Sequence, residues 1–300
     1  MKKVLIFGKG SYVGSNVEAH LNSLGGYDVT ILDAIGDGWR SFDFDGFDSL
    51  FHVAGIAHAD VSSVSDEVKR RYYAVNTDLA LEVAEKAKKA GVHQFIFMSS
   101  MIIYGGCKDG HIRASTEPCP SNFYGDSKWQ ADKRLQEMQD DSFNVSILRP
   151  PMIYGPGCKG NYQELRKLAL KLPVFPKSNN RRSMLYIGNL CEFVRRIIDE
   201  NEKGIFFPQN AEYSNTSELV KWIAEAHSRK ILIIPFTNWL LKLMMNIPGR
   251  IGNLATKAFG DSFYEADMSR FGLGYDKISL RKSIKLIEAG VASDYKATGK

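Results

Sequence analysis

A short apolar run that ends at a glycine-rich stretch constrains this chain more than any other feature. Residues 4–7 are all apolar and Gly8 follows directly, which is the pattern of a parallel strand buried on both faces. A helix is expected over residues 15–24, whose apolar side chains share one stripe before the glycine pair at 25–26. Because parallel strands need a crossover connection, this order predicts a strand-helix-strand unit.

The alternation continues to about residue 150. Further strands are expected at residues 29–32, 49–53, 94–98 and 145–148, and helices from about 78 to 90 and from about 124 onward. This order predicts an α/β protein with a Rossmann-like, doubly wound parallel sheet, which binds ligands outside the carboxyl ends of its strands. Beyond Pro150, stretches rich in proline and glycine interrupt helical segments, so a smaller C-terminal lobe is expected to cover the strand ends.

The composition is that of a globular protein. Of the 300 residues, 44% are hydrophobic and 24% are charged, which excludes a disordered chain. The net charge of +5 comes from basic residues spread in short pairs, whereas a nucleic-acid-binding face would need them clustered. No set of residues has the spacing of metal ligands, so we expect no metal site. Four scattered cysteines are expected to be free thiols: Cys107, Cys119, Cys158 and Cys191.

Two apolar stretches bear on location. The run at residues 4–7 is shorter than the core of about seven residues that a signal peptide needs, so a cytoplasmic protein is expected. Residues 231–247 are the most membrane-like segment, but polar residues and Pro235 interrupt them, and they fall short of the roughly 20 residues of a span. We therefore predict no membrane span, and favour a buried or substrate-covering helix over membrane contact for this segment.

Residues 8–14, GKGSYVG, have the position of a dinucleotide-binding turn. Gly8 would permit the tight turn, Gly10 would let a pyrophosphate approach the backbone, and Gly14 would let helix and strand pack closely. An ordinary strand-to-helix turn would also explain the glycines. Asp33, at the end of the second strand, favours the dinucleotide because its carboxylate can accept hydrogen bonds from the adenosine ribose.

Asp33 also bears on the choice of cofactor. A carboxylate there would repel a 2′-phosphate, so NAD is expected in preference to NADP, although Arg40 could partly restore NADP binding. We predict an NAD-binding Rossmann domain over residues 1–150, to which part of 180–210 returns, and a mainly substrate-binding lobe over 151–300.

Tyr124 and Lys128 form a second pattern at the start of a predicted helix, and Ser100 ends the preceding strand. Residues four apart share a helix face, so the Lys128 ammonium is expected near the Tyr124 phenol. To act as a base near pH 7, the tyrosine needs its pKa lowered by roughly three units, about 4 kcal/mol. That shift requires a buried ammonium, a cationic nicotinamide ring and a dry site together. The alternative is a chance pair of residues on one helix.

Together these residues resemble the extended short-chain dehydrogenase/reductase family, and within it the nucleotide-sugar epimerases, dehydratases and 4-keto reductases. The resemblance spans most of the chain and rests on residues 8–14, 33, 51–55, 76, 99–105, 124–128, 149–157 and 182–190. It implies that Tyr124 is the catalytic acid and base, that Lys128 binds the nicotinamide ribose and tunes the tyrosine, and that Ser100 hydrogen-bonds the sugar hydroxyl or ketone.

The resemblance also assigns residues to the two ligands, and it implies a homodimer. Substrate contacts are implied for Ser100, Met152 and Arg182, with Arg182 on the diphosphate of a nucleotide sugar. Cofactor contacts are implied for Gly8, Gly10, Ser11, Tyr12, Val13, Gly14, Asp33, Asp43, Ala54, Gly55, Asn76, Ser99, Tyr124 and Lys128.

The chain departs from the family pattern at several positions. Ser11 stands where the family has the middle glycine of its turn. Met101 follows Ser100 where 4,6-dehydratases have the first residue of an Asp-Glu pair, so dehydration is not expected. Met152 and Ser183 replace an asparagine and an aspartate of the substrate-binding motifs, which puts the contacts there in doubt.

Two enzymatic hypotheses follow from the resemblance. The first is an NAD-dependent 4-epimerase of a UDP-linked hexose, in which Tyr124 removes the O4 proton while hydride leaves C4 and later returns to the other face. The second is reduction of a 4-keto-6-deoxy nucleotide sugar by NADPH or NADH in surface-polysaccharide synthesis, a role that residues 149–157 resemble at least as closely. Asp33 weakly favours the first.

A non-catalytic nucleotide sensor is a third hypothesis, which the retention of Ser100, Tyr124 and Lys128 disfavours. His52 and His58 lie near the expected cofactor. Both are expected to be hydrogen-bonded polar residues and not ligands.

Overall fold

Six parallel strands form the central sheet of the computed structural model, which describes residues 1–57, 64–107, 109–235, 243, 246, 247, 256 and 258–290. The strand order is β10-β6-β4-β3-β1-β2, and every pairing of neighbours is parallel. The predicted α/β class with a doubly wound parallel sheet is therefore confirmed. The strands are β1 (Lys2–Phe7), β2 (Tyr27–Leu32), β3 (Ser49–His52), β4 (Gln94–Met98), β6 (Asn144–Leu148) and β10 (Gly204–Phe206).

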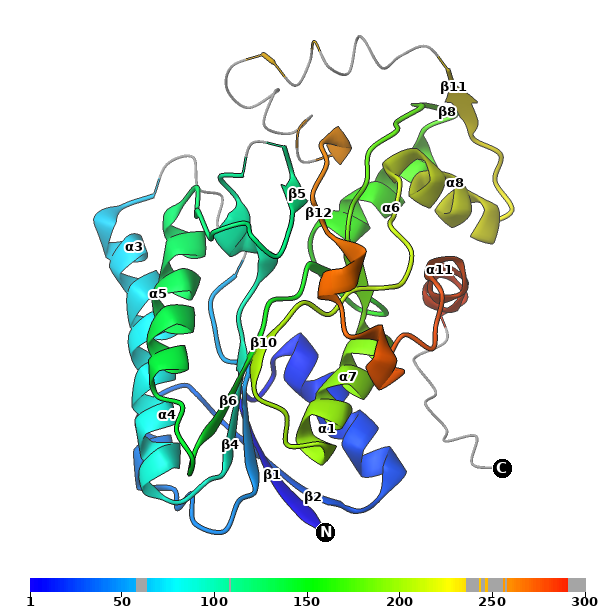
Figure 1. Cartoon of the computed structure of the whole chain (residues 1–300). Coiled ribbons are helices and arrows are strands. Elements are labelled where there is room, and N and C mark those ends of the chain that lie inside the picture. Colours follow the sequence, from blue (N-terminus) through cyan, green and yellow to red (C-terminus); the bar gives the residue numbers. More distant parts are fainter. Residues whose placement is uncertain are drawn as a thin grey trace.

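Helices cover both faces of this sheet. Figure 1 shows α3, α4 and α5 on one side and α1 and α7 on the other. The side chains of β3 and β4 are all buried between these layers. This explains the apolar run of β4, whereas β3 buries the polar Ser49 and His52 as well. The helices are α1 (Tyr12–Leu24), α3 (Asp66–Tyr73), α4 (Leu79–Lys89), α5 (Phe123–Glu137) and α7 (Ile187–Asp199), with a π-helical turn, η1 (Ala74–Asp78), between α3 and α4.

The strand order reverses at β1, which has β2 on one side and β3 on the other. The loops that follow β1 and β3 therefore meet at the carboxyl edge of the sheet, where doubly wound folds bind ligands. Gly8 ends β1 with a φ of +132°, and a Cβ there would lie 2.7 Å from the backbone nitrogen of Ala54. Only glycine allows this close approach of the two loops.

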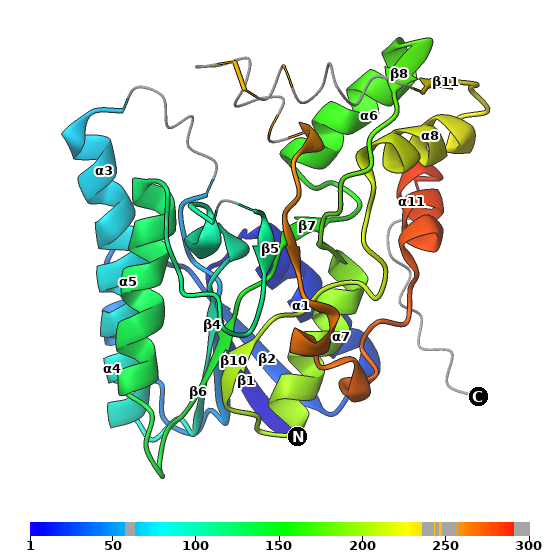
Figure 2. The same cartoon turned by 45° about the horizontal axis from the view of Figure 1, so that its top comes forward.

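The second lobe is built from helices and very short strands. It contains α6 (Asn161–Lys171), α8 (Thr216–Ala226) and α11 (Leu280–Glu288), and Figure 2 shows these helices grouped beyond the carboxyl edge of the sheet. Three two-stranded parallel pairs accompany them: β7 (Met152–Tyr154) with β9 (Met184–Tyr186), β8 (Val174–Pro176) with β11 (Leu232–Ile234), and β5 (His111–Ile112) with β12 (Phe263–Tyr264).

Smaller elements complete the chain. Between β2 and β3 there is room for the single turn α2 (Gly38–Ser41), and the 3-10 turns are η2 (Met101–Tyr104), η3 (Ala266–Met268) and η4 (Phe271–Leu273). The interpretation of residues 231–247 as a buried or covering helix is wrong at its start, since β11 is a strand and Leu232 is 65% exposed. Most of residues 236–247 lie outside the described part of the chain.

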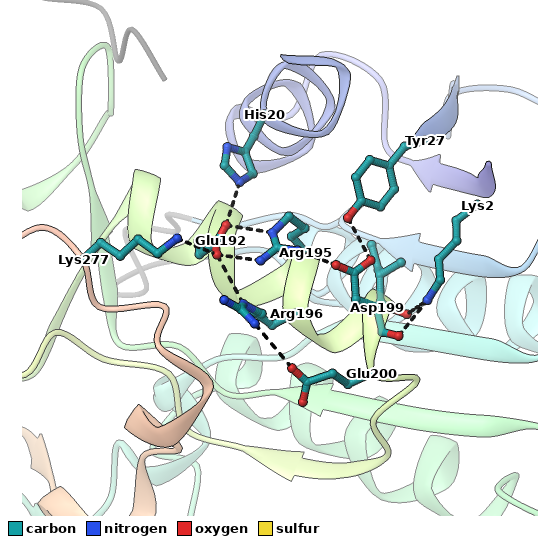
Figure 3. Close-up of polar contacts among 10 residues, drawn as sticks. Lys2, His20, Tyr27, Glu192, Arg195, Arg196, Asp199, Glu200 and Lys277 are labelled. Atoms are coloured by element: carbon teal, nitrogen blue, oxygen red, sulfur yellow. Dashed lines mark hydrogen bonds and ion pairs between the residues drawn. The ribbon is translucent and has the colours of Figure 1, made fainter. Parts of the chain in front are cut away.

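A buried carboxylate links α7 to helix α1 and to Lys277 near the C-terminal helix. Glu192 is 2% exposed and accepts from Arg195, Arg196 and Lys277 at 2.7, 3.3 and 3.0 Å, and it lies 3.2 Å from the Nε2 atom of His20 on α1. Figure 3 shows this convergence of basic side chains on one carboxylate. The cations hold the pKa of Glu192 well below its usual range, although burial by itself would raise it.

Candidate active site

The turn between β1 and α1 presents a helix amino terminus at the carboxyl edge of the sheet. Gly10 has a φ of +77°, and a Cβ there would meet nothing within 4 Å, so the backbone borders open space. Ser11 caps α1, since its Oγ accepts from the backbone nitrogen of Gly14 at 3.0 Å. This cap uses one of the amide groups that a helix terminus offers to phosphate. A serine directly before a helix is the usual sequence signal of such a cap. In the sequence, Ser11 is interpreted only as a replacement of the family's glycine.

Tyr12 and Val13 follow the cap and face the protein interior. Val13 packs against the main core. The Tyr12 hydroxyl is buried without a hydrogen-bond partner in the described structure, and a Cβ on Gly155 of the second lobe would lie 2.6 Å from it. The side chains of these two residues therefore support the turn, and a cofactor contact from them would come from the backbone.

Two exposed carboxylates lie where an adenosine is expected. Asp33 follows β2, and its Oδ1 accepts from the backbone nitrogen of Ile35 at 2.9 Å. Asp43 accepts from the backbone nitrogen of Asp45 at 3.0 Å. These local bonds orient each side chain within its own loop.

Arg40 is engaged elsewhere. Its Nε and Nη2 atoms donate to the two carboxylate oxygens of Glu82, each at 2.7 Å, and Nη1 pairs with Asp37. A guanidinium bound bidentately to one carboxylate must give up those bonds to reach a ribose phosphate. The structure therefore lends little support to the expected compensation by Arg40.

Asn76 clamps the loop after β3 to helix α5. Its amide donates to the carbonyl of Ile56 at 3.1 Å and to Oγ of Ser127 at 3.0 Å, and its Oδ1 accepts from the nitrogen of Ile56 at 2.9 Å. A Cβ on Gly55 would lie 3.0 Å from Asn76 Oδ1 and 3.0 Å from Lys128 Nζ. The π-helical turn that carries Asn76 gives no signal in the sequence, and such turns often mark functional sites.

Lys128 is buried beside this loop, being 6% exposed. Its Nζ donates to the carbonyl of Met98 at 3.0 Å and lies 4.9 Å from the centre of the Phe97 ring. That carbonyl is its one hydrogen-bond partner among the described residues, whereas an ammonium has three donors. Burial lowers the pKa of Lys128 to about 8, and Asp132 opposes the shift.

Tyr124 and Ser100 lie together at the opening of the site. Ser100 ends the loop after β4, where its Oγ accepts from the nitrogen of Ile102 at 3.2 Å and caps η2. Burial raises the pKa of Tyr124 to about 12, and the polar Ser100 side chain opposes that shift in part. Within the protein itself, burial outweighs the other influences on the phenol. The lowering of this pKa by the buried ammonium, the nicotinamide charge and a dry site together stays a prediction.

A buried polar cluster supports the catalytic loop, and sequence reasoning missed it. Asp132 on α5 accepts from Ser99 at 2.6 Å and from two nitrogens of Arg149, at 2.7 and 3.0 Å. Arg149 also donates to the Tyr104 hydroxyl at 2.6 Å. The Ser99 side chain thus holds the loop, so the expected cofactor contact of Ser99 would come from its backbone. A serine, an acid and an arginine so far apart in sequence offer no spacing from which to predict the cluster.

The predicted substrate residues come from the second lobe. Met152 is half-buried and pairs with Met184 between β7 and β9. Arg182 donates to the carbonyl of Gly260 at 3.0 Å, and burial lowers its pKa. The Sδ atom of Met101 accepts from Ser262 at 3.4 Å, which joins the loop of Ser100 to a segment that pairs with Arg182.

The two histidines named in the sequence analysis are His52 and His58. His52 is fully buried against Phe7, Phe95 and Phe97, and neither ring nitrogen has a hydrogen-bond partner in the described structure. The expectation of a hydrogen-bonded His52 is therefore wrong, and burial lowers its pKa to about 3, so it is neutral. His58 lies outside the described residues.

From the sequence we also predict free cysteines, no metal site and no membrane span. All four cysteines are free thiols. The described ranges contain no group of three His, Cys, Asp or Glu residues that could hold a metal ion. No helix in the described part of the chain combines the length and apolarity needed to cross a bilayer.

The turn, the clamp and the buried lysine together fit a dinucleotide. Open space borders Gly10 at a helix terminus, the glycines at 8 and 55 leave no room for a Cβ, and Lys128 keeps ammonium donors without a partner beside Gly55. A pyrophosphate suits the first feature and ribose hydroxyls suit the last.

Comparison with known proteins identifies the family. Residues 4–207 match the model of the NAD dependent epimerase/dehydratase family. The UDP-glucose 4-epimerase of Vibrio cholerae is 29% identical over 276 residues, which are 83% of this chain and 83% of that protein. The chain belongs to the NAD dependent epimerase/dehydratase family, so the predictions of the family and of an NAD-dependent enzyme are confirmed.

Solved structures show the same fold at low identity. The UDP-glucose 4-epimerase of Thermus thermophilus in complex with NAD superposes with a TM-score of 0.69 at 20% identity, over 96% of this chain and 98% of that one. A dTDP-4-dehydrorhamnose reductase from Bacillus anthracis in complex with NADP gives a TM-score of 0.71 at 16% identity, over 97% and 100%. At these identities the likeness concerns the fold.

Proposed function

We propose that this protein is an NAD-dependent 4-epimerase of a nucleotide-linked hexose, with UDP as the nucleotide. One observation carries the proposal: a buried ammonium with unused donors lies beside Gly55, on the helix that also carries Tyr124. The relative from Vibrio cholerae is a UDP-glucose 4-epimerase, which supports the reaction and the nucleotide.

NAD would be held by residues from three loops. The turn of Gly8, Gly10, Ser11 and Gly14 would receive the pyrophosphate at the amino terminus of α1, and Tyr12 and Val13 would contribute backbone. Asp33 and Asp43 would face the adenosine. The nicotinamide half would lie along Ala54, Gly55, Asn76, Ser99, Tyr124 and Lys128. Bound NAD supplies the acceptor for the hydrogen at C4 and a positive charge near the phenol.

Side chains of the protein would transfer the proton of the sugar hydroxyl. Tyr124 would take the proton from the sugar O4 and return it after the sugar has turned over. Its pKa of about 12 is too high for a base at neutral pH, so Lys128 must act together with the cofactor charge to lower it. Ser100 would orient the oxygen at C4 through a hydrogen bond.

The second lobe would bind the rest of the substrate. Arg182 is half-buried with its guanidinium beside Gly260, and we propose that it meets the diphosphate, for which a planar fork of donors is suited. Met152 would line the sugar cavity as an apolar surface. The division into an NAD-binding domain over 1–150 and a substrate lobe over 151–300 belongs to this proposal, with β10 and α7 completing the sheet of the first domain.

Reduction of a 4-keto-6-deoxy nucleotide sugar is the second candidate. The same Tyr124, Lys128 and Ser100 would then act in one direction, with the proton passing from tyrosine to the new hydroxyl. The fold shared with a dTDP-4-dehydrorhamnose reductase is compatible with it. Asp33 beside the expected ribose and the engagement of Arg40 by Glu82 favour NAD over NADP, which suits the epimerase better.

Purified protein distinguishes the two candidates. Interconversion of UDP-hexoses at catalytic enzyme concentration, without net change in NADH absorbance, is the result expected for the epimerase. Stoichiometric consumption of NADH or NADPH that requires a 4-keto sugar would instead establish the reductase. A panel of UDP-, GDP- and dTDP-hexoses with each cofactor defines the nucleotide. NAD binding with neither reaction would favour the sensor.

Two further properties complete the proposal. We propose a homodimer, as the family resemblance implies, and a cytoplasmic location. Sedimentation velocity at micromolar concentration tests the dimer, and fractionation of the native host tests the location.

A further inference from the structure

The outer edge of the second lobe carries a set of exposed apolar side chains. Leu168 and Leu172 lie at the end of α6, Val174 lies on β8, and Leu232 and Ile234 lie on β11; we call these five residues the apolar rim. Val174 and Leu232 are direct partners in the parallel pair, and they are 41% and 65% exposed. Figures 1 and 2 both place β8 and β11 at the margin of the molecule.

The strand geometry explains why these side chains point outward. Successive side chains of a strand alternate between its two faces. Ile233 packs against the main core and Phe175 is buried, so their neighbours Leu232, Ile234 and Val174 face away from the core. Exposed aliphatic side chains that share one strand face, with two more at the end of the helix just before β8, are a candidate interaction site.

The segments that carry the rim are rich in basic residues. Residues 165–191 contain six Lys and Arg and no Asp or Glu, and residues 226–235 contain Arg229 and Lys230 and no acid. Lys171, Arg229 and Lys230 are exposed, and none of them forms an ion pair within the described part of the chain. The nearest acids along the chain, Glu164 and Glu225, are already paired with basic residues.

This combination selects the kind of partner. A second copy of the same face would bring its own cations against these, which costs free energy in a two-fold contact. Nucleic acid would use the cations but gain little from aliphatic side chains. An anionic bilayer offers a negative surface for the lysines and arginines and an apolar layer directly beneath it for the leucines.

We propose that the apolar rim and the cations of the same segments dock this enzyme, peripherally and reversibly, on a membrane that contains anionic phospholipid. The docking lies at the edge of the lobe proposed to bind substrate, and it does not rest on which reaction the enzyme performs.

Co-sedimentation with vesicles tests the docking. We expect the protein to sediment with vesicles of 70% phosphatidylcholine and 30% phosphatidylglycerol in 0.1 M NaCl, and to remain in the supernatant with pure phosphatidylcholine. The triple variant K171E/R229E/K230E should partition at least about a hundredfold less, since each lysine or arginine near an anionic surface is worth roughly fivefold. In 0.5 M NaCl the wild-type binding should fall because salt screens these charges.

Matched control variants test whether vesicle binding depends on this surface. K89E/R134E/R70E reverses three exposed cations on α3, α4 and α5 and should leave vesicle binding unchanged. Leu232→Asn should weaken binding severalfold, whereas Ile205→Asn, at a 38% exposed position on β10, should not. Circular dichroism and NAD affinity must match the wild type for each variant.

Three results would overturn the proposal. The first is wild-type binding that is equal for the two kinds of vesicle. The second is a K171E/R229E/K230E variant that binds like the wild type. The third is absence of vesicle binding combined with a change of oligomeric state in Leu232→Asn by sedimentation velocity, which would show that a second copy of the chain covers the rim.

Discussion

Two buried ionisable groups, Glu192 and Lys128, have very different surroundings. Glu192 is contacted by Arg195, Arg196, Lys277 and His20. Lys128, in contrast, has a single carbonyl partner among the described residues, and burial lowers its pKa to about 8. Because an under-paired buried ammonium costs free energy, its presence beside Gly55 is best explained by a ligand that completes its hydrogen bonds. Glu192 thus has the full pairing of a structural charge, whereas the incomplete pairing of Lys128 supports its proposed role in binding the cofactor.

The largest expected effect comes from the phenol next to this lysine. Tyr124→Phe removes the group proposed to move the proton, so kcat should fall about a thousandfold, while NAD affinity, measured by fluorescence titration, should change less than about threefold. Tyr72→Phe is the matched control, because Tyr72 packs edge-on against Tyr124 but has no proposed role; it should retain activity. Full activity in Tyr124→Phe would remove the proposed mechanism.

Replacing the under-paired charge should stabilise the protein. Lys128→Met avoids burying an ammonium, so at pH 7 its free energy of unfolding should exceed that of the wild type by up to about 3 kcal/mol. The folded-state pKa of Lys128 is lowered to about 8, so between pH 8 and 10 the unfolded wild-type chain binds more protons than the folded one. The free energy of unfolding of the wild type therefore rises with pH in this range, and its difference from that of the variant becomes smaller. Urea unfolding at pH 7 and 9 measures both effects.

The matched control for that variant is Lys133→Met on the same helix, where Lys133 lies 5.5 Å from the Trp129 ring centre. It should change stability by less than about 0.5 kcal/mol. Lys128→Met should also weaken NAD binding, whereas Lys133→Met should not. A Lys128→Met protein that is less stable than the wild type would contradict the contrast with Glu192.

The paired charge should behave in the opposite way. Glu192→Gln leaves several cations without their carboxylate, and we expect a loss of about 2 kcal/mol in the free energy of unfolding, reduced from larger values because the cations are partly exposed. Since its pKa is depressed in the folded state, the contribution of Glu192 is present above the unfolded pKa and is lost as pH falls. Wild type and variant should therefore converge in acid, and kcat at pH 7 should be unaffected.

The smallest effect concerns the turn that would bind the pyrophosphate. Ser11→Gly removes the Oγ that occupies the Gly14 amide, at a cost of a few tenths of a kcal/mol in helix capping. The freed amide should raise NAD affinity by up to about fivefold, the value of one ordinary hydrogen bond. Calorimetric titration of NAD measures it, and a weaker affinity in Ser11→Gly would show that the serine itself contacts the cofactor.

Much of this architecture can be predicted from the sequence. The runs that became β1, β4 and β6 are apolar because both faces of a parallel sheet are covered, and the turn at Gly8 requires glycine for a local reason that any single sequence displays. The pairing of Tyr124 with Lys128 on one helix is equally local. The strand at 232–234 could not be predicted, because a short apolar run has no periodicity that separates strand from helix.

The partners of these residues could not be predicted in the same way. Asn76 reaches Ile56 and Ser127 through a π-helical turn, and Asp132 meets Arg149 and Ser99 across the sheet edge. Each contact joins residues that are 17 or more positions apart, and nothing in the spacing of the sequence specifies which pairs form.

The amino-acid sequence by itself determined the doubly wound sheet, the glycine turn and the placement of Tyr124 and Lys128 on one helix, because neighbours along the chain impose those features. Tertiary structure alone decided how buried each charge became and how many partners it received. Burial and pairing depend on segments brought together from distant parts of the chain, and they set whether a tyrosine has a pKa near 12 or a lysine a pKa near 8.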